Sequence, residues 1–406
     1  MEDERRARRI ATGLGIAGAL GLWALVALLA SHESRQPQVL GRYSRGYTVF
    51  LAAAFACAIA ATGLLHGGVR LRARRAAPRL AALLLGTFLA AGLAESYLRR
   101  FDPLGFSYYR EVSRYLQLRV PDEELLFVHP ASETHRLDGV EVRFNALRMR
   151  GPEVPPPDAA RRVLFLGDSV TFGWGVDEDH TFAARVARGL SDGRGAGLRT
   201  VAPGDLDWAA LNAGVCSYNT RQEAAWLERE GFDLGPELIV LTIVDNDVLD
   251  LRDKWSREAG RQLRLAQRIH TALKGSYLYK LLLHAFNHGP DGVALHGANQ
   301  DLPEDDPGWR SSLEALERIV AACEGRGVPL VLVYYRVVRR PFTDRYLASI
   351  ERTVAPRGVV DTVTWFEDAP VEAWVNSIVD SHPNARAHAV LAERLLATGA
   401  LGAHPR

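Results

Sequence analysis

The chain has 406 residues, of which 48% are hydrophobic and 24% charged, and its 49 basic and 48 acidic side chains leave a net charge of +1. This balance argues against a nucleic-acid-binding protein, because contacts with phosphate backbones need a clear excess of Lys and Arg. Three cysteines are too few for a disulfide scaffold or a zinc site made only of thiolates. The composition also excludes collagen, a coiled coil and a disordered chain.

The N-terminal 98 residues contain long uncharged runs. Residues 10–30 and 46–65 have no charged side chain, and residues 80–94 form a shorter run that ends at Glu95. A helix needs about 20 apolar residues to cross a bilayer core. The third run reaches this length only if Glu95 snorkels toward an interface. We therefore expect a membrane region at 1–98 with transmembrane helices at 10–30, 46–66 and 80–98.

Arginines flank these runs unevenly. Four precede the first run and five lie between the second and third, whereas the loop after the first run has three. The positive-inside rule then places the N-terminus and the second loop in the cytoplasm. We expect a multi-pass protein of the cytoplasmic (inner) membrane whose large C-terminal part is extracytoplasmic or periplasmic. If the third run is instead a buried soluble helix, that part stays in the cytoplasm.

Residues 99–158 are rich in aromatic residues and prolines. They include extended stretches at 126–128 and 140–144 and end in three consecutive prolines at 155–157. We interpret them as a lead-in segment with short strands, closed by a stiff Pro-rich linker.

From residue 159 to 406, apolar stretches alternate with helix-like ones. The candidate strands are 163–166, 209–213, 238–244, 330–335 and 359–363. Continuous apolar strands that alternate with helices predict an α/β fold with a five-stranded parallel sheet covered on both faces. An irregular, partly helical insertion at 249–309 interrupts this pattern, and we expect it to cap or border the site.

Polar residues follow the predicted strands at the edge where parallel sheets bind ligands. They are Asp168 and Ser169 after the first strand, Gly214 after the second, Asn246 and Asp247 after the third, and Asp380 and His382 before the last helix. Together they supply what acyl transfer requires, namely a nucleophile, a base, an orienting carboxylate and oxyanion donors.

These segments resemble the conserved blocks of the GDSL or SGNH hydrolase superfamily. Residues 165–175, Phe-Leu-Gly-Asp-Ser-Val-Thr-Phe-Gly-Trp-Gly, are similar to the first block, and Gly214, Asn246 and His382 stand in the second, third and fifth. The blocks follow the family order. The resemblance implies a flavodoxin-like three-layer sandwich, and it does not extend to residues 1–158.

The resemblance also implies a role for each residue. Ser169 would be the nucleophile and His382 its base, and Asp380 would orient the imidazole. The oxyanion would be bound by the backbone N–H groups of Ser169 and Gly214 and by the side-chain amide of Asn246. No cofactor and no metal ion is implied.

Two positions depart from the family pattern. Val244 replaces a glycine two residues before Asn246, and Val379 stands where the family has its aspartate, three residues before His382. Asp380 is one residue closer to the histidine. A serine–histidine dyad helped by a backbone carbonyl is therefore an alternative to the triad.

Other candidate residues favour structural roles. His284 and His288 have i, i+4 spacing, but they lack the Glu of a HExxH motif and a third ligand, so we interpret them as part of a helix face. Asp168 and Asp247 are expected to shape their turns by local hydrogen bonds. Whether Cys216 and Cys323 form a disulfide stays open.

The preferred function is a membrane-anchored serine esterase that hydrolyses acyl esters, with O-acetyl or lipid esters of the cell envelope as substrates. One alternative is an O-acyltransferase that modifies an envelope polysaccharide together with a membrane partner. The other is an inactive SGNH binding module. No nucleic-acid partner is expected, and the sequence names no protein partner.

Overall fold

The computed structural model describes residues 91–195, 206–248, 275–288 and 302–402, together with single positions and short stretches within 23–63 and at 273 and 293. The chain divides into two units. The first, here called the N-terminal unit, comprises Met1–Leu104 and Gln262–Gly292. The second, here called the sheet unit, comprises Gly105–Arg261 and Val293–Arg406.

The described part of the N-terminal unit contains a helix at 91–101 and α10 (Tyr277–His288). The Glu95 carboxylate accepts hydrogen bonds from the backbone N–H groups of Tyr277 (3.0 Å) and Leu278 (2.8 Å). Free N–H groups at a helix N-terminus favour a carboxylate. The Glu95 carboxylate therefore caps the N-terminus of α10.

No helix in the described residues is both long and apolar enough to cross a bilayer. Most residues of the predicted transmembrane segments 10–30, 46–66 and 80–98 lie outside the residues that the structure describes.

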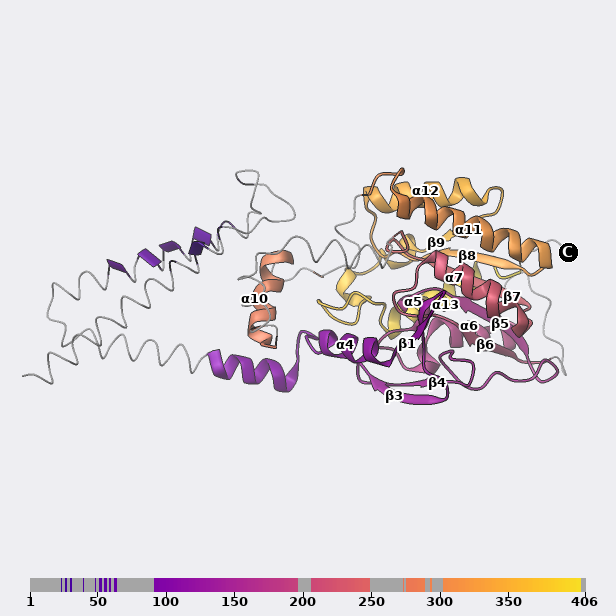
Figure 1. Cartoon of the computed structure of the whole chain (residues 1–406), viewed down its shortest axis with the longest axis horizontal. Helices are drawn as coiled ribbons and strands as arrows, with labels where there is room; N and C mark the ends of the chain where they lie inside the picture. The colour runs from indigo at the N-terminus through magenta and orange to yellow at the C-terminus, as the bar shows by residue number, and fades with distance from the viewer. Residues whose placement is uncertain are drawn as a thin grey trace, which may run out of the picture. The chain divides into compact units, whose positions relative to one another are not determined.

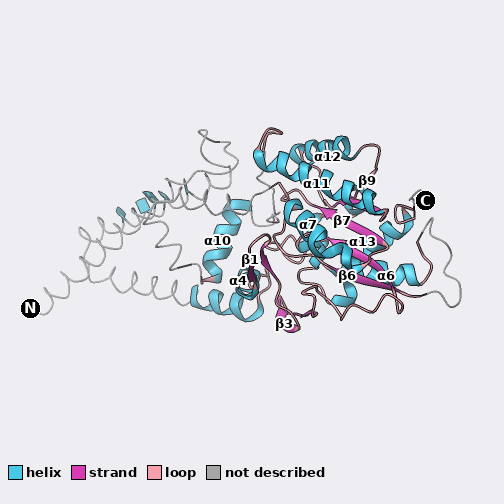
Figure 2. Ribbon diagram, turned by 45° about the vertical axis from the view of Figure 1, so that its right-hand side comes forward, coloured by secondary structure: helices cyan, strands magenta, loops and turns pink. Residues whose placement is uncertain are grey.

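Five parallel strands form the central sheet, in the order β6-β5-β7-β8-β9 (Figures 1 and 2). They are β5 (Arg161–Leu166), β6 (Trp208–Asn212), β7 (Leu238–Ile243), β8 (Leu330–Tyr334) and β9 (Val359–Asp361). The predicted parallel α/β sheet is thus confirmed. After β6 the chain crosses back past β5 to form β7, and this reversal makes the ends of β5 and β7 the point where ligands bind in such sheets.

Helices cover both faces of the sheet because successive strand residues point to opposite sides. Leu164 and Leu166 pack in one hydrophobic cluster, and Val163 and Phe165 pack in the other. The first cluster joins the sheet to α7 (Thr220–Trp226), α11 (Pro307–Arg326) and α12 (Pro341–Val354). The second joins it to α6 (Phe182–Ser191) and α13 (Ala385–Ala397). The result is a three-layer sandwich.

From Gly105 on, the lead-in segment belongs to the sheet unit. It contains α4 (Tyr108–Leu118) and the strand pairs β1 (Val120–Asp122) with β2 (Leu126–Val128) and β3 (Glu133–Leu137) with β4 (Val140–Phe144). The strands predicted at 126–128 and 140–144 are confirmed. Tyr115 and Phe144 share a buried cluster with Phe172 and Trp174 of the sheet unit. The sheet unit therefore includes this part of the lead-in together with the predicted hydrolase domain at 159–406, apart from residues 262–292.

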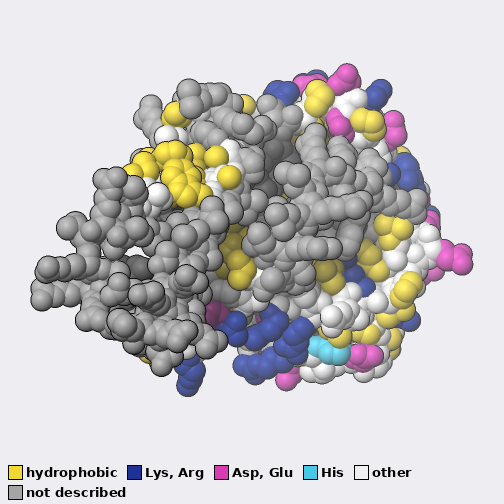
Figure 3. All heavy atoms as spheres, turned by 60° about the vertical axis from the view of Figure 1, so that its left-hand side comes forward, with side chains coloured by type: hydrophobic (Ala, Val, Ile, Leu, Met, Phe, Trp, Pro, Cys, Tyr) yellow, Lys and Arg dark blue, Asp and Glu magenta, His cyan; other side chains and the backbone are white. Residues whose placement is uncertain are grey.

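The predicted insertion at 249–309 includes α10, but most of its other residues lie outside the described part of the chain. The remaining short helical turns are Glu178–His180, Leu227–Gly231, Phe232–Leu234, Val363–Phe366 and Val371–Ala373. On the face drawn in Figure 3, described basic side chains gather in the lower part of the view, and basic and acidic side chains alternate along its right-hand side.

Candidate active site

Ser169 lies at the first position of α5 (Ser169–Phe172), directly after the turn that ends β5. Gly167 in this turn has φ +149°, and a Cβ there would lie 2.2 Å from the Thr171 hydroxyl oxygen. Only glycine fits this backbone. The Asp168 carboxylate accepts a hydrogen bond from the Val170 N–H at 2.8 Å and so caps α5. The glycine at 167 and the capping carboxylate of Asp168 together fix the position of Ser169.

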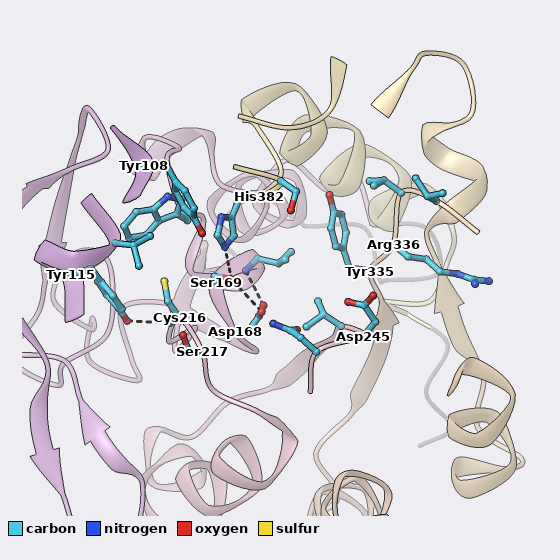
Figure 4. Close-up of a pocket in the computed structure, with 18 of the residues that line it drawn as sticks. Tyr108, Tyr115, Asp168, Ser169, Cys216, Ser217, Asp245, Tyr335, Arg336 and His382 are labelled. Carbon is cyan, nitrogen blue, oxygen red and sulfur yellow. Dashed lines mark hydrogen bonds between the residues drawn. The ribbon is translucent and has the colours of Figure 1, made fainter. Parts of the chain in front are cut away.

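Ser169, His382 and Asp380 form a continuous chain of hydrogen bonds. Figure 4 shows its first link, between His382 and Ser169. The Ser169 Oγ lies 2.8 Å from His382 Nε2, and His382 Nδ1 lies 2.5 Å from Asp380 Oδ1. With the Nδ1 proton donated to Asp380, Nε2 is free to accept the serine proton. Asp168 Oδ2 is farther from the hydroxyl, at 3.2 Å. The hydroxyl is therefore placed to donate to His382.

Asp380 reaches His382 despite its unusual sequence position. Its backbone N–H and the backbone N–H of Ser377 each donate to the other residue's carbonyl oxygen, so residues 377–380 close a tight turn. Asn376 donates from Nδ2 to Asp380 Oδ2 (3.1 Å) and to the Trp174 carbonyl (3.0 Å). The geometry is that of a triad, and no backbone carbonyl takes the place of the carboxylate. Asparagine is common in turns, so the sequence carried no signal for the role of Asn376.

The environment of His382 favours its protonated form. Burial by itself lowers the pKa of the imidazole, but the negative charge of Asp380 and the hydrogen bond to it raise the pKa, and the net shift is upward. The side chain is 12% exposed, and that of Asp380 is 2% exposed. Asp380 thus favours the imidazolium form of His382 electrostatically.

Gly214 is not placed as the resemblance implied. Its N–H donates to the Asn212 side-chain oxygen at 3.0 Å. A Cβ at this position would lie 2.2 Å from the Phe172 backbone nitrogen, so the glycine allows β6 and α5 to approach closely. Gly214 therefore has a packing role, and its N–H is already engaged.

Ser217 lies in the next turn of the same loop and lines the pocket beside Ser169. The turn is closed by a hydrogen bond from the Tyr218 N–H to the Val215 carbonyl at 3.0 Å, and Ser217 has φ +74°. Glycine or asparagine is typical of this third turn position. The backbone N–H of Ser217 donates to no group within the described residues. Sequence reasoning missed this residue because a serine gives no signal for a left-handed backbone.

The pocket around Ser169 has a volume of about 310 Å³. Tyr108 of α4 and Trp174 flank His382, with ring centroids 5.9 and 6.1 Å from the His382 ring. On the other side, Asn246 lines the pocket, and Asp245 forms an ion pair with Arg340. Within the described residues, the side-chain amide of Asn246 makes no hydrogen bond.

The remaining predicted residues have structural positions. Asp247 accepts a hydrogen bond from the Val244 N–H at 3.0 Å and so shapes its turn, as expected. Cys216 and Cys323 are both buried free thiols, and burial raises the pKa of each to about 12. Within the described ranges, no group of three His, Cys, Asp or Glu side chains is arranged to hold a metal ion.

No protein-family model and no curated protein matches the chain. Several solved structures are similar to it. One is TesA, with 14% identity, 59% of this chain and 100% of that chain covered, and a TM-score of 0.35. Another is a catalytic mutant of Axe2, an acetylxylan esterase from Geobacillus stearothermophilus, with 18% identity, coverage of 60% and 94%, and a TM-score of 0.35. A third is a lipase/acylhydrolase from Enterococcus faecalis, with 13% identity, coverage of 58% and 94%, and a TM-score of 0.35.

These identities and TM-scores are too low to assign the protein to a class. The assignment therefore depends on the topology and the site of the chain itself. The chain is a doubly wound α/β protein with a Ser-His-Asp triad at the carboxyl ends of its parallel strands. Its motifs, their order and this geometry resemble those of the SGNH hydrolases.

Proposed function

We propose that the protein is a serine esterase of the SGNH hydrolase type, anchored to a membrane and acting on acyl esters outside the cytoplasm. The observation that carries the esterase activity is the hydrogen-bonded chain from Ser169 through His382 to Asp380. The anchoring and the location are supported by the uncharged runs at 10–30, 46–65 and 80–94 and by the arginines that flank them.

The geometry supports a two-stage acyl transfer. Ser169 Oγ attacks the ester carbonyl carbon while His382 Nε2 takes its proton, and the imidazolium then gives that proton to the departing alcohol. This leaves an acyl group on Ser169. In the second stage His382 removes a proton from a water molecule that attacks the acyl carbon. The imidazolium then returns that proton to Ser169 Oγ as the bond between Oγ and the acyl carbon breaks, which releases the carboxylic acid and restores the serine hydroxyl and neutral His382.

The negative oxygen formed in each stage needs hydrogen-bond donors. The Ser169 N–H lies at the start of α5, where the N-terminal N–H groups favour negative charge. The Asn246 side-chain amide and the Ser217 N–H are the other donors that the pocket offers without an existing partner among the described residues. In this proposal Ser217 replaces Gly214 in the oxyanion hole.

Labelling with a fluorophosphonate probe tests the esterase. We expect the full-length chain in detergent to be labelled, Ser169→Ala to lose labelling, and His382→Ala to lose most of it. Ser349→Ala removes a buried hydroxyl of α12 and is the matched control, which should be labelled like the unaltered protein. A folded chain without labelling would contradict the proposal.

Product analysis separates hydrolysis from transfer. Release of acetate from an aryl acetate without any sugar present is expected for a hydrolase. Turnover that depends on an added sugar acceptor would instead indicate an O-acyltransferase.

A further inference from the structure

The loop that carries Ser217 is held by two side chains of the lead-in segment, one from α4 and one from its C-cap residue. Tyr115 Oη accepts a hydrogen bond from the Cys216 N–H at 3.1 Å (Figure 4). Arg119 donates from Nη2 to the Cys216 carbonyl at 2.6 Å and to Ser217 Oγ at 3.1 Å. Tyr115 and Arg119 are four residues apart and so lie on one side of α4 and its C-terminal end.

The direction of the Ser217 N–H follows from these contacts. The Cys216 carbonyl and the Ser217 N–H belong to one planar trans peptide unit and point in opposite directions. A guanidinium that holds the carbonyl on one side therefore turns the N–H to the other. Ser217 also needs this support because φ +74° is unfavourable for a residue with a Cβ.

The two side chains are themselves held firmly. Tyr115 is 2% exposed, and its hydroxyl lies 2.7 Å from His129 Nε2, while His129 Nδ1 lies 3.2 Å from the Arg148 carbonyl. Burial lowers the pKa of His129 to about 3, so the neutral ring donates from Nδ1 and accepts the Tyr115 proton at Nε2. The Tyr115 oxygen is thereby left to accept from Cys216. The Arg119 guanidinium stacks on the Phe127 ring at 3.7 Å.

We propose that Tyr115 and Arg119 are positioning residues that hold the Ser217 N–H in the orientation of an oxyanion donor. This inference rests on the proposed esterase function. The lead-in segment then contributes to turnover through the backbone of the Cys216–Ser217 turn, without contact with the reacting atoms.

Kinetics of full-length variants test this proposal. Loss of one whole oxyanion donor lowers turnover by about 10²- to 10³-fold. Because Tyr115→Phe and Arg119→Met leave the N–H present but poorly aimed, we expect each to lower kcat by about 10-fold or more, with KM changed by less than about threefold. A boronic acid, which forms a tetrahedral adduct on Ser169, should bind each variant more weakly by a similar factor.

Two control variants report the effect of lost packing alone. Tyr346→Phe removes a buried hydroxyl that bonds Ser312, and Arg229→Met removes a cation that pairs with Asp122. Both should keep kcat and boronic-acid affinity near the unaltered values even where the melting temperature falls. If Tyr115→Phe does not fold, Arg119→Met carries the test.

Three outcomes are distinguishable. An unaltered chain that turns over, with both α4 variants impaired as described, supports the inference. An unaltered chain that turns over, with kcat and boronic-acid affinity of the α4 variants within twofold of the controls, overturns the inference alone. A folded unaltered chain with neither labelling nor turnover overturns the esterase proposal and this inference with it.

Discussion

Asp380 illustrates how one carboxylate sets both the rate and the pH range of the proposed reaction. It accepts the His382 Nδ1 proton and so selects the tautomer whose Nε2 faces Ser169. Its charge also raises the pKa of His382 against the opposing effect of burial. His382 acts as a base only when it is neutral, so activity is lost as the pH falls through this raised pKa. The acid limb of kcat/KM should therefore lie above the ordinary histidine value of about 6.5.

The substitution Asp380→Asn should change both the rate and the pH dependence of the proposed reaction. Without the carboxylate, burial lowers the pKa of His382, so the acid limb of the kcat/KM profile moves to lower pH. The plateau should fall by about 10²- to 10⁴-fold, because the favoured tautomer is lost. Asp122→Asn removes a carboxylate that pairs with Arg229, and it should leave the pH profile unchanged. An unshifted acid limb in Asp380→Asn would contradict the assigned role.

The raised pKa of His382 also affects stability. A group whose folded pKa is above its unfolded value contributes stability that is fully present below the unfolded value of about 6.5. This contribution is lost as the pH rises through the folded pKa. His382 is therefore in its neutral, active form at pH values above its folded pKa, where its ionisation no longer contributes to folding stability.

At the scale of secondary structure, the sheet was predictable and the turns were not. Buried strands such as β5 and β7 are continuous apolar runs between breakers, so their positions follow directly from the sequence. Ser169, His382 and Asp380 were predictable as residues that flank such elements. Ser217 and Tyr115 were not, because their roles depend on a left-handed backbone and on a contact across 101 residues. The sequence placed Gly214 in the oxyanion hole because a glycine after β6 fits the family motif. In the structure its N–H donates to Asn212, and the absence of a side chain permits close packing against Phe172.

The packing role of Gly214 gives a direct stability prediction. Gly214→Ala places a Cβ against the Phe172 backbone, which cannot move without shifting α5, and should destabilise the protein by about 1–3 kcal/mol. Gly325→Ala in α11 has no atom within 4 Å of the added Cβ. Alanine is the better helix former, so this control should be neutral or stabilising by up to about 1 kcal/mol. Equal melting temperatures for the two variants would contradict the packing role.

At the scale of the whole molecule, the sequence predicts a membrane region up to residue 98 and a catalytic region after it. Fusion of a reporter enzyme that is active only outside the cytoplasm checks this topology. We expect activity for a fusion after Pro156 and none for a fusion after Arg75, which lies in the arginine-rich loop. The reverse pattern, or an inactive fusion after Pro156, would place the triad in the cytoplasm.

The position of α4 in the sheet unit changes where a minimal catalytic fragment has to start. The three prolines at 155–157 look like a natural boundary for recombinant expression. A fragment cut there would lack Tyr115 and Phe144, leaving the aromatic surface of Phe172 and Trp174 uncovered and the Cys216–Ser217 turn without its supports. A fragment that begins at Gly105 keeps them. The stretch that resembles a spacer in the sequence is part of the wall of the active site.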